Sequence, residues 1–138
     1  MRVSVTRRCA APPEAVWPWI SDPGKHVQTL PSTVGQVEVR DNGDIACVIT
    51  AMGVSEPMEV HVTERQEPHR LVEERIDGKR AGTTIFEVVP DGDGSKVTLT
   101  SDVDLPFLVA GLAKKPMEQS LTQQLENLDR LSSGSEPD

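Results

Sequence analysis

The chain has 138 residues, and its 22 Asp and Glu against 14 Lys and Arg give a formal net charge of −8. A chain of this length forms one domain with a sizeable core. The acidic balance argues against nucleic-acid binding, which requires a basic surface. With two Trp, two Phe and no Tyr, the chain also lacks the aromatic side chains from which a stacking platform for bases is built.

Hydropathy predicts a cytoplasmic protein without an integral membrane segment. No window reaches about 18 consecutive apolar residues, and the first residues, MRVSVTRRCAAPPE, contain no apolar signal-peptide core. Cys9 and Cys47 are too few for a disulfide framework. We expect both to be small buried hydrophobic residues, and we expect the protein to be a monomer or a homodimer.

The N-terminal part predicts one strand followed by two short helices. Alternating apolar residues predict a strand at 2–10. Consecutive prolines at 12–13 suit the start of a helix, which the run Asp22-Pro23-Gly24 ends. A second short helix is expected at 24–30, stopped by Pro31.

Arg7 is the unusual member of the first strand, because it shares a face with Val3, Val5 and Cys9. Two interpretations are open. Either Arg7 lies near a strand end and extends its charged group to water, or it places a cation inside a pocket.

The middle of the chain predicts strands joined by tight turns. Asn-Gly within 41–44 is typical of a β-hairpin, and the strand at 96–105 alternates most clearly. Hairpins require antiparallel pairing, and six or seven twisted strands tend to curl. The expected strands here are 34–40, 45–52, 58–64, 71–76, 81–89 and 96–105.

The segment from Asp104 to Leu131 predicts the one long helix. Asp104 is a candidate N-cap with Pro106 in the first turn. Pro116 predicts a kink or a break near 114–116, either as a packing adjustment or as a hinge over a cavity. An apolar stripe recurs at the helical period: Met117, Leu121, Leu125 and Leu128. Polar residues fill much of the other side: Gln123, Gln124, Glu126 and Asn127.

These elements predict an α+β fold in which a curved antiparallel sheet wraps the C-terminal helix. The volume between sheet and helix is then either filled by side chains or left as a pocket. Residues 133–138 are expected to form a disordered tail.

The run Ala11-Pro12-Pro13-Glu14-Ala15-Val16-Trp17, followed by Ile20-Ser21-Asp22-Pro23, resembles the opening of the START-like, helix-grip superfamily, also called SRPBCC. It is most similar to the polyketide cyclase/dehydrase and lipid-transport members. Later features agree: Glu67-Pro68-His69-Arg70-Leu71 before a strand, Phe86 to Pro90 leading into 92–95, and Glu126-Asn127-Leu128 near the end.

The resemblance implies a seven-stranded antiparallel sheet gripping the C-terminal helix, a START-like ligand-binding domain over 1–132, and a cavity for an apolar or aromatic ligand. Members range from polyketide aromatases and cyclases to hormone and lipid carriers. The fold therefore does not by itself give the function.

Polar residues expected to face inward are the candidates for chemistry, and the catalytic candidates are Glu74, Ser101 and His26. A carboxylate in an apolar cavity has a raised pKa and can serve as acid or base. Ser101 either takes part in catalysis, or it bonds to the backbone or is simply buried. His26 either titrates beside a ligand near neutral pH or is an exposed loop histidine.

The strand at 71–76 has a charge on either face. Glu74 shares one face with Val72 and Ile76, while Glu73 and Arg75 share the other with Leu71. The alternative is a strand near the sheet edge with both faces in water.

The residues expected to bind the ligand combine apolar and polar side chains: Trp17, His26, Val60, Glu74, Phe86, Ser101, Leu112, Met117 and Leu121. Trp17 is either core packing or cavity lining. His26, His61 and His69 lack the spacing of metal ligands, and no Gly-rich phosphate loop occurs, so we expect neither a metal nor a cofactor.

Three functions remain open from the sequence. The first is binding of a small apolar or aromatic, polyketide- or lipid-like molecule between sheet and helix. The second is a polyketide cyclase/dehydrase-type enzyme that uses a cavity residue for proton transfer. The third is a protein-interaction module with a filled interior.

Overall fold

The computed structural model describes residues 1–51, 53–77 and 81–134. Within them, seven strands form one antiparallel sheet in the order β1-β7-β6-β5-β4-β3-β2. The strands are β1 (Arg2–Cys9), β2 (Val34–Val39), β3 (Ile45–Ala51), β4 (Val54–Gln66), β5 (Arg70–Asp77), β6 (Gly82–Asp91) and β7 (Gly94–Val103). The helices are α1 (Pro13–Ser21), α2 (Pro23–His26), a 3-10 turn (Val27–Thr29) and α3 (Phe107–Ser132).

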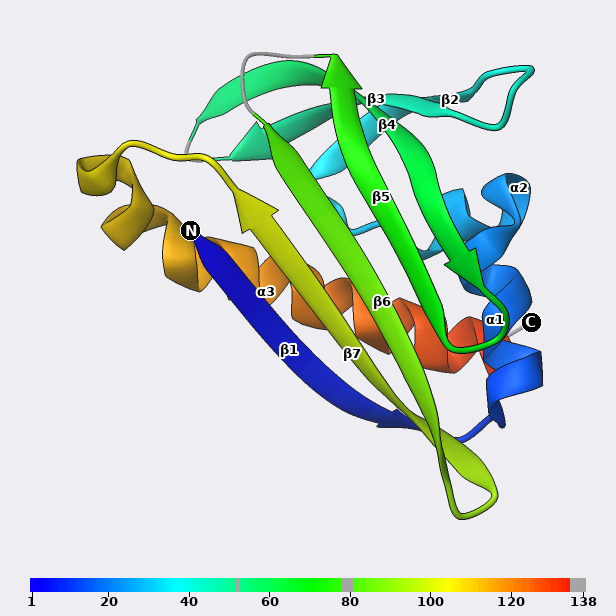
Figure 1. Ribbon diagram of the computed structural model, residues 1–138. Helices are drawn as coiled ribbons and strands as arrows, with labels where there is room; N and C mark the ends of the chain where they lie inside the picture. Colours follow the sequence, from blue (N-terminus) through cyan, green and yellow to red (C-terminus); the bar gives the residue numbers. More distant parts are fainter. Residues whose placement is uncertain (52, 78–80, 135–138) are drawn as a thin grey trace.

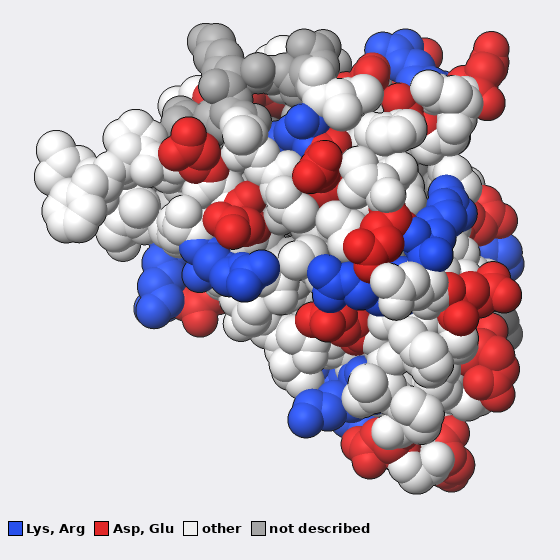
Figure 2. All heavy atoms as spheres, in the orientation of Figure 1, with Lys and Arg blue, Asp and Glu red and all other residues white. Residues whose placement is uncertain are grey.

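The predicted α+β helix-grip arrangement is confirmed. Figure 1 shows the strands curving in front of α3, which crosses behind them, while α1 lies beside the C-terminal half of α3. No described helix is both long enough and apolar enough to cross a bilayer. Figure 2 shows acidic and basic side chains interspersed over the face of the molecule that it presents.

Hairpins explain the strand order, because each consecutive pair from β2 to β7 is antiparallel and adjacent. The turns at Gly43 and Gly92 have φ values of 90° and 62°, which favour glycine. β4 begins at Val54, earlier than the predicted residue 58, because Val54 pairs with Ala51 of β3. Register shifts in β4 bend the strand and raise its twist.

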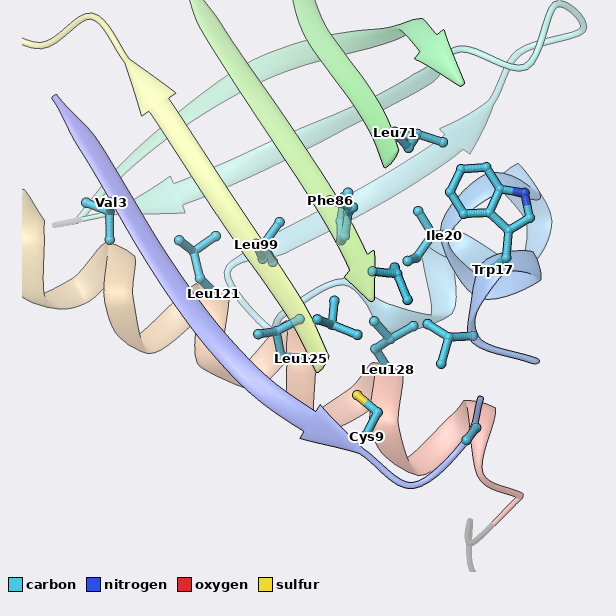
Figure 3. Packing of buried hydrophobic residues seen from close by; sticks show 14 residues of the cluster. Val3, Cys9, Trp17, Ile20, Leu71, Phe86, Leu99, Leu121, Leu125 and Leu128 are labelled. Atoms are coloured by element: carbon cyan, nitrogen blue, oxygen red, sulfur yellow. The ribbon is translucent and has the colours of Figure 1, made fainter. Parts of the chain in front are cut away.

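The core lies between the inner face of the sheet, α1 and the C-terminal half of α3. The predicted stripe of α3 faces it: Leu121, Leu125 and Leu128 are buried, and Met117 packs against the same cluster. Figure 3 shows these leucines beneath Leu99 and Phe86 of the sheet. At roughly 25 cal/mol per Å² of apolar surface, this burial is the main stabilising contribution.

α3 departs from its prediction at its start. Pro106, not Asp104, occupies the N-cap position, and no side chain caps the helix there. Asp104 is drawn away because its N–H donates to the carbonyl oxygen of Ala81 at 3.0 Å. The helix is unbroken through Pro116 and ends at Ser132. Of the expected tail, residues 133–134 form a turn and 135–138 lie outside the described residues.

The first turns of α3 extend past the edge of the sheet (Figure 1). Phe107, Leu108 and Leu112 are accordingly 91%, 83% and 73% exposed.

Arg7 joins β1 to α3. Its Nε donates to Oδ2 of Asp129 at 3.0 Å, and Oδ1 of Asp129 accepts from the backbone N–H of Ala10 at 3.1 Å. Arg7 is therefore a link between two elements rather than a cation in a pocket.

Candidate ligand-binding cavity

A cavity of about 690 Å³ lies between the sheet and the first half of α3. Small-molecule sites typically measure about 300–1,000 Å³. Most of its walls are aliphatic or sulfur-containing side chains, among them Ile45, Cys47, Met58, Val60 and Leu121. The interior is thus not filled by side chains, which excludes the filled-interior alternative.

The position of the cavity follows from the sizes of the side chains along the sheet. The large aromatic residues Trp17 and Phe86 pack in the core at the α1 end. Toward the other end the inward positions of the strands carry smaller residues, including Cys47, Thr84 and Ser101, opposite Ala113 of α3. A curved sheet closed over small side chains leaves space.

Exposed residues line the cavity on the β3–β4 hairpin and on the middle of α3. Thr50, Ala51 and Val54 line it from the hairpin, and Pro116 and Gln119 line it from the helix. Thr50, Ala51 and Val54 are exposed. The lining residues His26, on α2, and Glu73 are buried, and the part of the cavity that they line is called the α2 end here.

His26 and Glu73 form a buried pair that lines the cavity. Nε2 of His26 lies 3.6 Å from Oε2 of Glu73, and the two side chains are 4% and 9% exposed. Nδ1 of His26 lies 3.2 Å from the carbonyl oxygen of Trp19. The ring also meets Phe86 edge-on, with centroids 5.3 Å apart.

The carbonyl oxygen of Trp19 can only accept, so Nδ1 of His26 carries a proton. A neutral ring would then present the lone pair of Nε2 to the carboxylate of Glu73, which is repulsive. Burial lowers the pKa of His26, but the charge of Glu73, its hydrogen bonding and the Trp19 carbonyl together outweigh it and raise that pKa. The contacts on the two ring nitrogens thus favour the imidazolium form of His26 beside the Glu73 side chain.

α3 positions the segment that carries His26. Nδ2 of Asn127 donates to the carbonyl oxygens of Thr29 and Leu30 at 3.2 and 3.4 Å. Nε2 of Gln124 donates to Oγ1 of Thr29 at 3.4 Å, and that hydroxyl donates to the carbonyl oxygen of His26 at 2.7 Å. Part of the polar side of α3 therefore contacts this segment.

The structure brings five of the predicted ligand-binding residues together. His26, Val60, Ser101, Met117 and Leu121 all line the cavity.

The other four do not line it. Trp17 and Phe86 belong to the packed core. Leu112 is exposed on the part of α3 beyond the sheet. Glu74 is exposed, because the register of β5 turns its side chain outward.

Glu73, not the predicted Glu74, is the glutamate of β5 that lines the cavity. Leu71 and Glu73 are buried, and Arg75 lines the cavity, whereas Ile76 is 53% exposed. β5 is a central strand, so the edge-strand alternative is wrong. The exposed-loop alternative for His26 is also wrong, since the residue is 3% exposed.

Both cysteines are free and buried, as expected. Burial raises the pKa of Cys9 to about 11. Burial also raises the pKa of Cys47, with Glu73 adding to the rise and Arg75 opposing it. Within the described residues, no group of three His, Cys, Asp or Glu side chains is arranged to hold a metal ion.

The chain matches the family of polyketide cyclases, dehydrases and lipid-transport proteins over residues 1–132, and it belongs to this family. No curated protein matches it.

Solved structures share the fold. TTHA0849 from Thermus thermophilus is 22% identical with a TM-score of 0.84, covering 99% of this chain and 100% of that one. The KanY protein is 20% identical with a TM-score of 0.82, covering 96% and 97%. NE0264 from Nitrosomonas europaea is 16% identical with a TM-score of 0.73, covering 98% and 96%.

Proposed function

We propose that this protein binds a small apolar or aromatic molecule in the cavity between the sheet and α3. The observation that carries the proposal is the cavity of about 690 Å³ with mainly apolar walls. Removing apolar ligand surface from water supplies the affinity, and a few polar groups fix the orientation. Membership of a family that includes lipid-transport proteins agrees with this role.

Fluorescence of the neutral dye Nile red tests the proposal, because the dye brightens in apolar surroundings. The cavity-filling variant Val60→Trp should weaken dye binding at least about tenfold, which corresponds to about 1.4 kcal/mol. Val89→Trp is the matched control, since Val89 lies on β6 and is 50% exposed. Equal dye affinity in the wild type and Val60→Trp, or no dye binding, would contradict the proposal.

Native mass spectrometry of the protein after mild purification provides a second readout. A carried molecule should appear as added mass on the wild type and be reduced in Val60→Trp. Added mass of equal size and abundance in both proteins would place the molecule outside the cavity.

A cyclase/dehydrase-type activity is the second candidate, and the buried His26–Glu73 pair favours it. A carboxylate and an imidazolium that face one cavity can accept and donate protons to a bound carbonyl compound. Ser101 lines the same space.

The test of this activity is turnover of a poly-β-ketone. Glu73→Gln and His26→Gln should abolish turnover, while Glu74→Gln should retain it. Equal turnover in all three variants would exclude the pair as the catalytic group.

A further inference from the structure

The carboxylate of Glu73 is a hydrogen-bond acceptor that remains open to the cavity. Its side chain is 9% exposed, and its ionic partner His26 lies 3.6 Å away. In the described part of the chain, every fully enclosed side-chain nitrogen or oxygen has a hydrogen-bond partner. A carboxylate offers about four lone-pair sites for hydrogen bonds and His26 occupies one, so the Glu73 oxygens can accept a further bond from the cavity that Glu73 lines.

We infer that the α2 end of the cavity selects apolar molecules carrying a neutral hydroxyl donor, such as a phenol or a long-chain alcohol, over apolar carboxylates. This inference rests on the proposed binding function. The hydroxyl donates to the Glu73 carboxylate, and the apolar body lies against Met58, Val60 and Leu121. His26 positions the carboxylate and balances its charge.

A hydroxyl suits this position because a hydrogen bond to an ionised acceptor is stronger than one between neutral groups. An ether or a hydrocarbon supplies no donor, so the acceptor sites of the carboxylate that His26 does not occupy would lose water without a replacement hydrogen bond. A carboxylate ligand would bring a second negative charge beside Glu73, whose own charge already neutralises His26, so the two carboxylates would repel each other.

Arg75 is the group that could reverse this preference, since it also lines the cavity. Its side chain packs over Gly82, where an added Cβ would lie 3.1 Å from Nε of Arg75. Arg75 is itself engaged by another group, as is the cavity-lining Glu56. We therefore assign selection to Glu73, and the experiment includes an anionic ligand.

Isothermal titration of the full chain at neutral pH with three ligands of one shape tests the inference. β-Naphthol supplies a donor, β-naphthyl methyl ether removes it, and β-naphthoate replaces it with a charge. The wild type should bind β-naphthol about tenfold more tightly than the other two, the change expected for one hydrogen bond to a charged group. This comparison requires no variant.

Glu73→Gln should weaken the binding of β-naphthol about tenfold and strengthen the binding of β-naphthoate, because the substitution removes the charge of the side chain and keeps its shape. Glu74→Gln is the matched control and should leave all three affinities unchanged. A β-naphthol preference that survives in Glu73→Gln would overturn the assignment of selection to this residue.

Two outcomes separate this inference from the function on which it rests. Binding of β-naphthoate as tight as that of β-naphthol, with Val60→Trp blocking both, would overturn the hydroxyl preference and leave cavity binding intact. Absence of binding by all three ligands and by Nile red would overturn both.

Discussion

His26 and Glu73 decide the charge at the α2 end of the cavity. The backbone carbonyl of Trp19 fixes the proton on Nδ1 of His26, and the adjacent carboxylate favours a second proton on Nε2. The pKa of His26 is therefore raised above its ordinary value in the folded protein, although burial opposes the rise. In the unfolded chain the pKa of His26 has its ordinary value of about 6.5.

This difference links stability to pH. Below about pH 6.5 the histidine is protonated in both states, and the stabilisation by the pair is fully present. As the pH rises from about 6.5 through the folded pKa, the stabilisation is lost. Thermal unfolding between about pH 5.5 and 9 should show the stability advantage of the wild type over Glu73→Gln falling as the pH rises. Glu74→Gln should show no such trend, and an advantage that grows with pH would contradict the assignment.

The two cysteines report on whether the cavity can be entered. Cys47 lines the cavity and is 6% exposed, whereas Cys9 is sealed in the core at 0%. Burial raises the pKa of both thiols, which slows their reaction. At about pH 8.5, N-ethylmaleimide should modify Cys47 slowly and leave Cys9 unmodified, and β-naphthol should protect Cys47. Peptide mass spectrometry measures this, and faster modification of Cys9 would contradict the described packing.

At the scale of elements, α3 holds both ends of the fold together. Asp129 on its last turns receives the side chain of Arg7 and the backbone of Ala10. Asn127 and Gln124 fix the residues that follow His26. Helical periodicity predicts the apolar stripe of α3, but it does not tell which polar residues contact a neighbouring segment.

Loss of the Asp129 carboxylate should therefore destabilise the folded protein. Asp129→Ala removes two charge-assisted hydrogen bonds and should lower the free energy of unfolding by about 1–3 kcal/mol. Asp102→Ala is the matched control: Asp102 is 49% exposed and lies 3.8 Å from Nε of Arg2, so its loss should cost about 0–1 kcal/mol. Urea unfolding gives both values, and equal costs would show that the Asp129 link contributes little.

For the whole molecule, the order of strands and helices could be predicted because it depends on local signals. Period-two patterns, Asn-Gly at the first hairpin and the stripe ending at Leu128 each act over a few residues. The prediction of a helix N-cap at Asp104 was wrong because the backbone N–H of Asp104 donates to the carbonyl oxygen of Ala81. The opening of β4 was missed because Glu56 and Pro57 interrupt the apolar alternation.

The cavity and its closed end could be predicted only in part. Periodicity placed Glu73 and Glu74 on opposite faces of one strand, but which face is inward depends on pairing across the sheet. Leu112 lies next to a lining residue in sequence, yet α3 passes the sheet edge there. The size of the cavity depends on side chains from several elements that meet only in the folded chain.

A crystal structure of the protein with β-naphthol tests the central claim most directly, that the sheet and α3 enclose space for an apolar guest. The account predicts the naphthalene ring among Met58, Val60 and Leu121, with its hydroxyl about 2.7 Å from a Glu73 carboxylate oxygen. Naphthol bound against the exposed start of α3 at Phe107 and Leu108, with the cavity closed by rearranged side chains, would contradict it.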